Sequence, residues 1–491
     1  MNSKRPILIL ILGLVISMQS LMIDAEASDA VANSAALREA VTRGALEQHL
    51  NTLQTIAEQS GGHRSAGSAG YDASVDYFRA LLESAGYDIT VQPFEVDVFD
   101  VLSPAVLEQL SPDVQAFVEG TDVTTMAFSG SGEVTAAVEP IDLRLPPGAV
   151  NSSTSGCEAA DFASFTTGHI ALLQRGTCTF LVKAQNAVAA GASAVIIFNE
   201  GQAGRRELFP GSLGRSELTI PVLSTSFDTG LALAQAGGTA HLKTDTLSER
   251  ASTSNLIAES RTGDPSQILM SGAHLDSVRE GPGIQDNGSG SVTLLEVALQ
   301  LAEHFAVNDP ASSSMTGRVR FAWWGAEEQG LLGSRHYVDS LSPEELERID
   351  AYLNLDMIGS PNFGRFVYDG DSSEQTSGIP LPEGSGTIEL IFEAYFETQE
   401  LPISPISIGQ RSDHAAFVRA GIPVGGLFTG AEDLKGARGA ARFGGEAERA
   451  FDPCYHRACD TIENVDFNVL EQMADAAAHA IMTLAGGTDL R

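Results

Sequence analysis

The feature that most constrains the fold is a glycine-rich loop between two apolar segments. Residues 267–273, QILMSGA, predict a short buried strand, and apolar side chains from Val292 to Phe305 recur at helical spacing. The loop between them, 273–290, reads AHLDSVREGPGIQDNGSG and carries a histidine and several aspartates. In open α/β sheets, ligands bind just outside the carboxyl ends of strands, where helix amino termini add oriented N–H groups. We therefore expect His274 and Asp286 to lie at such a sheet edge.

Strand-like and helical segments alternate through the rest of the carboxyl-terminal half. Strands are predicted at 318–324, 351–355 and 422–428, and a last helix at 469–484. The glycine-, alanine- and arginine-rich stretch 436–448 is expected to be a loop. Alternation of this kind predicts an α/β fold, a mostly parallel mixed sheet covered by helices.

The amino-terminal part adds two helices and a strand to this plan. The pattern predicts helices at 35–60 and 71–85 and a strand at 87–99. His63 and Arg64 lie in the glycine-rich turn between the two helices, where a histidine is usually a surface residue, and no role is expected for them.

A separate β-rich module interrupts this pattern. Short β-like runs occur at 132–138, 169–174 and 194–198, with one helix near 180–190. Because no histidine–carboxylate cluster of metal-ligand spacing occurs there, we expect a binding or lid domain. The 491 residues are too long for one ordinary core. They divide into an amino-terminal part at 28–128, the inserted module at 129–245 and a main part at 250–491.

The amino terminus predicts export. Lys4 and Arg5 precede an apolar run at 6–16, and Ala25-Glu26-Ala27 follows, as in a signal peptide spanning 1–27. The expected product is secreted or periplasmic without stable membrane insertion, and an uncleaved anchor is the alternative. A net charge of −35 argues against nucleic acid or an anionic membrane as partner. The oligomeric state is not predicted.

The four cysteines fall into two local pairs. In an exported protein, Cys157 with Cys178 and Cys454 with Cys459 are expected to form disulfides. A zinc site made of all four is the alternative, although neither pair has the CxxC spacing of compact zinc sites.

Candidate metal ligands gather at the predicted strand ends. His274, the pair Glu327-Glu328 and Asp356 each follow a strand, Asp286 lies in the first loop, and His456 lies between Cys454 and Cys459. Each residue alone also has a structural explanation, as a buried histidine, a turn former or a helix cap. Their shared placement favours a mixed nitrogen and oxygen site for zinc, or less specifically cobalt or manganese. Five ligands are too many for one catalytic zinc but suffice for two ions that share a carboxylate.

The paired glutamates divide the work at such a site. We assign Glu328 to the metal and Glu327 as the general base, which takes a proton from water and returns it to the leaving amine. Asp276 is expected to accept the other ring N–H of His274 and fix its tautomer, although it also suits a loop cap. Because His274 must be neutral to bind a metal, activity is expected to fall in acid.

The motifs AHLDS, QDNGSG, WWGAEEQGLLGS, NLDMIGS, QRSDHAAF and CYHRACDT together resemble the two-zinc exopeptidase family of bacterial leucyl aminopeptidases and glutamate carboxypeptidases. The resemblance covers about 35–99 and 254–484. It implies that Asp286 bridges two Zn²⁺ ions, that His274 and Asp356 complete one site, and that Glu328 and His456 complete the other. Glu327 matches the family's general base.

The same resemblance implies softer roles around the substrate. Tyr455 would stabilise the oxyanion, Arg411 would contact the substrate, and Met357 and Phe428 would line an apolar side-chain pocket. The stretch from Gly156 to Asn199 resembles the protease-associated domain, a module often inserted into exported peptidases.

These observations predict a secreted aminopeptidase for peptides with a free amino terminus and a hydrophobic, leucine-like first residue. A carboxypeptidase or dipeptidase on the same fold is the alternative, which would need a cationic pocket for a terminal carboxylate. A non-catalytic binding ectodomain is the third possibility, and the intact ligand set argues against it.

Overall fold

The chain forms two compact units in the computed structural model, which describes residues 30, 33–215, 217–307, 309, 315–488 and 490. Unit 1 takes the chain up to Phe94 together with Ser252–Arg491, and unit 2 takes Glu95–Ala251. Strands β1 (Asp88–Gln109) and β8 (Thr239–Glu259) each begin in one unit and end in the other. The module predicted at 129–245 lies within unit 2, and the predicted signal peptide lies outside the described residues.

Unit 1 contains the mostly parallel mixed sheet that the sequence predicts. Its strand order is β8-β10-β9-β11-β14-β12-β13. The pairs of β9 with β10 and β11, of β11 with β14 and of β12 with β13 are parallel, whereas β8 with β10 and β12 with β14 are antiparallel. The strands are β9 (Asp264–His274), β10 (Gly317–Trp324), β11 (Ile349–Leu355), β12 (Phe366–Asp369), β13 (Ser404–Ser407) and β14 (Val424–Phe428). The predicted α/β fold class is confirmed.

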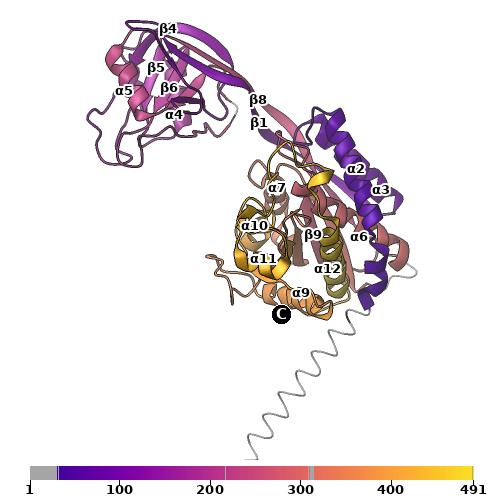
Figure 1. Cartoon of the computed structure of the whole chain (residues 1–491). Helices are drawn as coiled ribbons and strands as arrows, with labels where there is room; N and C mark the ends of the chain where they lie inside the picture. The colour runs from indigo at the N-terminus through magenta and orange to yellow at the C-terminus, as the bar shows by residue number, and fades with distance from the viewer. Residues whose placement is uncertain are drawn as a thin grey trace, which may run out of the picture. The chain divides into compact units, whose positions relative to one another are not determined.

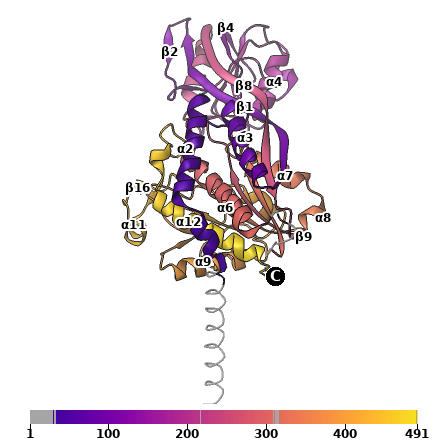
Figure 2. The ribbon, with the colours of Figure 1, turned by 90° about the vertical axis from the view of Figure 1, so that its right-hand side faces the viewer.

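Helices cover both faces of this sheet. One face packs against α2 (Arg43–Gln59), α3 (Ala69–Ser84), α6 (Ser289–Phe305), α9 (Ser385–Thr398) and α12 (Phe467–Ala485). The other face packs against α7 (Leu332–Ser340) and α10 (His414–Arg419) (Figure 1). Trp323 and Trp324, both fully buried at the end of β10, belong to the two different cores, because successive side chains of a strand point to opposite faces. Figure 2 shows α2 beside α6 and α12, where these helices contact one another.

Two local predictions were wrong. The helix predicted at 35–60 is interrupted, because Thr42 has extended backbone angles and its side chain accepts the N–H of Ala45 to start α2. The stretch predicted as a loop at 436–448 contains the helix α11 (Ala437–Phe443). Gly436 and Gly444 bound this helix, and the alanines and arginines between them favour helix.

The strands of unit 2 follow the order β8-β4-β5-β6-β7-β3. The run from β4 to β7 is parallel. The elements are β2 (Gln115–Phe117), β3 (Val123–Thr125), β4 (Gly132–Pro140), β5 (Ile170–Gln174), α4 (Phe180–Ala189), β6 (Ala194–Phe198), β7 (Val222–Thr225) and α5 (Phe227–Ala236). Strands β2 and β1 pair as an antiparallel hairpin.

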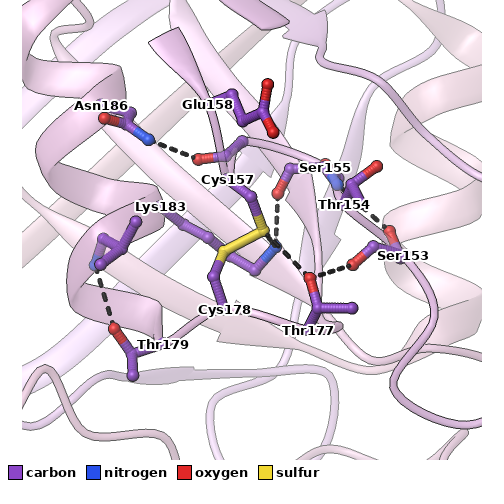
Figure 3. Close-up of a disulfide and its surroundings, with 12 residues drawn as sticks. Ser153, Thr154, Ser155, Cys157, Glu158, Thr177, Cys178, Thr179, Lys183 and Asn186 are labelled. Carbon is purple, nitrogen blue, oxygen red and sulfur yellow. Dashed lines mark hydrogen bonds between the residues drawn. A yellow bond between two sulfur atoms is a disulfide. The ribbon is translucent and has the colours of Figure 1, made fainter.

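The expected disulfide between Cys157 and Cys178 is present in unit 2 (Figure 3). The fully buried Lys183 on α4 donates from Nζ to the carbonyl of Ser155 and lies 3.6 Å from the Cys157 Sγ. Burial lowers the pKa of the Lys183 ammonium to about 8. Among the described helices of both units, none has the length and apolar character to cross a membrane.

Candidate metal centre

His274 ends β9 and is fixed by the loop that follows it. Its side chain is buried, and Nδ1 lies 3.1 Å from the backbone carbonyl of Asp276, an arrangement in which Nδ1–H donates and Nε2 is left as the ligand atom. The Asp276 carboxylate, which we expected in this role, lies 3.6 Å from Nδ1. Its two oxygens instead accept the N–H groups of Glu327 and Glu328 at 3.2 and 3.4 Å. Asp276 therefore joins the end of β9 to the paired glutamates after β10.

Asp286 lies between the two candidate histidines. It belongs to the irregular turn η2 (Ile284–Gly288), where its φ and ψ of −107° and 95° are not helical. Its Oδ1 is 3.2 Å from Nε2 of His274, and its Oδ2 is 3.3 Å from Nε2 of His456. Each oxygen of one carboxylate thus faces a different imidazole.

A second carboxylate accompanies each histidine. Asp356, directly after β11, places Oδ1 3.4 Å from Nε2 of His274. Glu328 places Oε2 2.9 Å from Nε2 of His456. The five residues predicted as ligands therefore converge as two histidine–carboxylate pairs on either side of Asp286.

The loop that carries His456 is closed by the second expected disulfide, between Cys454 and Cys459. His456 has a left-handed backbone with φ of 57°, and its ring stacks on Tyr455 at a centroid distance of 3.8 Å. Asp460, directly after the disulfide, accepts the N–H groups of Gln285 and Asp286. The disulfide loop therefore contacts the Asp286 turn through both its histidine and its aspartate.

The donor set fits a divalent metal. Oδ1 of Asp356 and Oε1 of Glu328 are buried and lack a hydrogen-bond donor among the described residues, whereas Oδ2 of Asp356 accepts from Ser412 at 2.6 Å. Ligand atoms within 4.8 Å of one another occur in the groups His274–Asp286–Glu328 and His274–Glu327–Asp356. Imidazole nitrogen with carboxylate oxygen is the donor chemistry of catalytic zinc sites.

A further group of carboxylates, Asp369, Asp371 and Glu389, also has ligand atoms within 4.8 Å of one another. It has no histidine, and backbone N–H groups already donate to all three carboxylates. The mixed nitrogen and oxygen chemistry of zinc is therefore found at the first site.

The electrostatics of the site link metal binding to protons. Burial alone raises the pKa of Asp286, but its hydrogen bonds with His274 and His456 lower that pKa below the ordinary value. Burial lowers the pKa of both histidines, but their carboxylate partners outweigh it, raising that of His456 to about 10 and that of His274 well above its ordinary value. A metal must therefore displace protons from both imidazoles.

Glu327 is placed beside the same group of ligands. Only 8% of the residue is exposed, and burial, followed by the charges of Asp413, Asp356 and Glu328, raises its pKa well above the ordinary value in spite of His274. A carboxyl with a raised pKa can accept and return a proton near neutral pH.

The predicted substrate residues lie around this centre. Arg411 is exposed and forms an ion pair with Glu432 at 2.9 Å, and its Nη2 lies 3.5 Å from the hydroxyl of Tyr455. Met357 follows Asp356 and is buried, with a left-handed φ of 53°. Phe428 ends β14 and is half-buried, with its ring 6.1 Å from that of Phe366.

Sequence reasoning missed several residues that shape the site. Asn287 accepts the N–H of Met357 and donates to the carbonyl of Leu355, so it joins the Asp286 turn to the end of β11. Ser412, Asp460 and Arg64 were also missed. The available signal was their position within or beside the motifs QDNGSG, QRSDHAAF and CYHRACDT and the glycine-rich turn.

Comparison with known proteins follows the same division of the chain. The family model described as peptidase family M28 matches residues 255–481, and the PA domain model matches residues 142–233. An aminopeptidase of Pseudomonas aeruginosa is 48% identical over 444 residues, which span 90% of this chain and 80% of that protein. Leucine aminopeptidase 2 of Arthroderma otae is 39% identical over 414 residues, spanning 82% and 76%.

Solved structures show the same fold. BSAP, a zinc aminopeptidase from Bacillus subtilis, superposes with a TM-score of 0.55 at 26% identity and covers 89% of this chain and 94% of its own. An aminopeptidase from Aneurinibacillus sp. strain AM-1 superposes with a TM-score of 0.60 at 24% identity, covering 91% and 95%.

Proposed function

The chain belongs to peptidase family M28, with an inserted PA domain, and on that premise we propose that it is an exported aminopeptidase that holds two zinc ions and prefers hydrophobic amino-terminal residues. That it is a metallo-aminopeptidase, a hydrolase, follows from the family and from its relatives. The zinc count, the preference and the export are the parts we propose.

The observation that carries the two-ion proposal is the position of Asp286. Its two oxygens face His274 and His456, and each histidine has its own second carboxylate, Asp356 or Glu328. Asp286 would be the shared ligand, with His274 and Asp356 on one ion and Glu328 and His456 on the other. Zinc held by these residues would supply Lewis-acid chemistry toward the scissile carbonyl and toward water.

The protein's own groups move the proton. In this proposal Glu327 accepts a proton as water attacks the carbonyl carbon of the first peptide bond. As the C–N bond breaks, Glu327 returns that proton to the leaving amine, so the base is regenerated. The hydroxyl of Tyr455 would donate to the oxygen that gains negative charge in the tetrahedral intermediate.

The residues expected to contact the substrate favour the binding of an amino terminus over that of a carboxyl terminus. A carboxypeptidase needs a cation for the terminal carboxylate, but Arg411 is already paired with Glu432. The acidic side chains around Glu327 suit an ammonium group better. Met357 and Phe428 would supply apolar contacts for a leucine-like side chain, and a relative carries the name leucine aminopeptidase 2.

Export is proposed from the predicted signal peptide at 1–27 together with the two disulfides, which persist in oxidising compartments.

A panel of aminoacyl anilides beside amino-terminally blocked peptides tests the activity. We expect hydrolysis of the anilides, fastest for leucine-like residues, no cleavage of blocked peptides, and reversible loss of activity with phenanthroline. Cleavage of blocked peptides at their carboxyl end would overturn the aminopeptidase reading, and full activity of the metal-free protein would overturn the metal mechanism.

A further inference from the structure

Arg64 is a fully buried cation in a turn for which the sequence predicts no role. None of its surface is exposed, and arginine is almost never fully buried without partners. The turn also packs tightly against the start of α3, because a Cβ added at Gly70 would lie 2.2 Å from the carbonyl oxygen of His63. A buried cation on a tightly packed turn indicates that the guanidinium is needed where it lies.

The guanidinium of Arg64 binds the carbonyl groups of the loop that leads to Asp286. Nε donates to the carbonyl of Pro282 at 2.9 Å, Nη2 donates to that of Gly283 at 2.6 Å, and Nη1 donates to that of Leu275. The backbone of Arg64 adds two bonds with Ser277, from Arg64 N to Oγ at 2.9 Å and from Ser277 N to the Arg64 carbonyl at 3.3 Å. One side chain thus ties together both ends of the segment 275–283.

Asp460 binds the residues that directly follow this segment. Its Oδ1 accepts the N–H of Gln285 at 2.9 Å, and its Oδ2 accepts the N–H of Asp286 at 3.0 Å. Asn464 donates to the same carboxylate at 3.2 Å. Asp460 is itself buried, so water does not compete for these hydrogen bonds.

The two anchors act on one continuous stretch. Gly283 is bound through its carbonyl by Arg64, Gln285 and Asp286 are bound through their N–H groups by Asp460, and only Ile284 lies between them. The loop also packs against the disulfide loop, because a Cβ added at Gly281 would lie 2.1 Å from the carbonyl oxygen of Arg457. Burial lowers the pKa of the Arg64 guanidinium, and the nearby carboxyl groups of Asp276 and Asp460 oppose that shift.

We propose that Arg64 and Asp460 are positioning residues that fix Asp286 between His274 and His456, Arg64 through the carbonyl groups before the turn and Asp460 through the N–H groups within it. The inference rests on the proposed two-metal function, because Asp286, the residue that Arg64 and Asp460 would position, is the shared ligand in that proposal. Neither residue touches the reacting atoms. Substitution of either residue should lower the metal affinity more than it disturbs the fold.

Two conservative variants test the inference. Arg64→Lys keeps the charge but cannot reach three carbonyls with a planar fork. Asp460→Asn keeps the shape but turns one acceptor into a donor that faces an N–H group. Because groups that orient metal ligands typically contribute about 10–100-fold to metal affinity, we expect each variant to bind zinc more weakly by about that factor. Zinc titration against a chromophoric chelator measures the affinity, and the visible spectrum of the cobalt-substituted protein reports the ligand geometry.

Two matched controls separate positioning from general stability. Arg320→Lys removes another guanidinium fork, a half-buried one that binds Glu259 and Tyr337. Asp466→Asn alters another carboxylate that accepts two backbone N–H groups, those of Asn468 and Val469 at the start of α12. Both controls should lose stability in urea and keep the zinc affinity and cobalt spectrum of the wild type.

The outcomes distinguish this inference from the proposed function. If the wild type binds fewer than two zinc equivalents, the two-ion proposal fails. If it binds two, and both variants match its affinity within twofold and its cobalt spectrum, the positioning inference is overturned. Should Arg64→Lys fail to fold, Asp460→Asn decides the question alone.

Discussion

The two disulfides are predicted to rank differently for stability and for metal binding. Loss of the bond between Cys157 and Cys178 should cost more free energy of unfolding, and loss of the bond between Cys454 and Cys459 should cost more zinc affinity. In the chain-entropy model a cross-link stabilises by restricting the unfolded chain, and the effect grows with loop length. The bond between Cys157 and Cys178 spans a sequence separation of 21, which corresponds to about 3 kcal/mol. The bond between Cys454 and Cys459 spans a separation of 5, which corresponds to about 2 kcal/mol. Removal of the first should therefore cost more free energy of unfolding.

The effect of each disulfide on metal affinity should depend on where the disulfide lies and not on the length of the loop that it closes. The shorter loop carries His456, whose Nε2 lies 2.9 Å from Glu328, and is followed at once by Asp460, which binds the Asp286 turn. Replacement of both Cys454 and Cys459 by serine frees the loop that holds a ligand, and we expect zinc affinity to fall at least about 10-fold. Cys157 and Cys178 lie in unit 2, and their replacement should leave zinc affinity unchanged.

Urea unfolding with two probes measures both effects in the same samples. The chain has only two tryptophans, Trp323 and Trp324, and both lie on β10, so their fluorescence reports unit 1. Far-ultraviolet circular dichroism reports both units. A shifted fluorescence transition is expected only for the Cys454 and Cys459 variant, and zinc titration is performed without denaturant. Unchanged zinc affinity in that variant, or weakened zinc binding in the unit 2 variant, would refute the reasoning.

Three further predictions concern single side chains. Glu327→Ala should keep its zinc and lower kcat by about 10²–10⁴-fold, and wild-type turnover in that variant would remove the base assignment. Ser412→Ala takes away the 2.6 Å bond to Asp356 and should weaken zinc binding by about 10-fold, measured by chelator competition. Burial raises the pKa of Glu389 to about 7, so its contribution to stability is present in acid and is lost as pH rises through about 7. Glu389→Gln should then raise the free energy of unfolding at pH 8 by about 1 kcal/mol after allowance for solvent screening, with little change at pH 4, and an equal effect at both pH values would contradict this.

The sequence was sufficient to predict the helices and strands whose buried residues recur with a simple period. Strands β9, β10 and β11 carry apolar runs that end at, or are followed within a few residues by, His274, Glu328 and Asp356, so these three candidate ligands could be found from strand ends. The local errors concerned one interrupted helix and one helix that was not predicted. Thr42 stops one helix and starts another, and Gly436 and Gly444 bound a helix inside a stretch whose composition predicts a loop. Both depend on the backbone angles of one or two residues, which composition does not report.

Arg64 and Asp460, which we propose to position Asp286, could not be predicted from the sequence for a different reason. A metal ligand is recognisable because its side-chain type is restricted by the metal, whereas Arg64 and Asp460 bind main-chain groups that every residue possesses. Their partners are therefore invisible in the sequence of the loop. Arg64 is more than 200 positions from the carbonyls it binds, and Asp460 is 174 positions from Asp286. What could be inferred in advance is only that a carboxylate shared between two histidines needs a rigid backbone. A glycine-rich segment such as 281–290 has little stiffness of its own, so that rigidity must come from contacts with groups elsewhere in the chain.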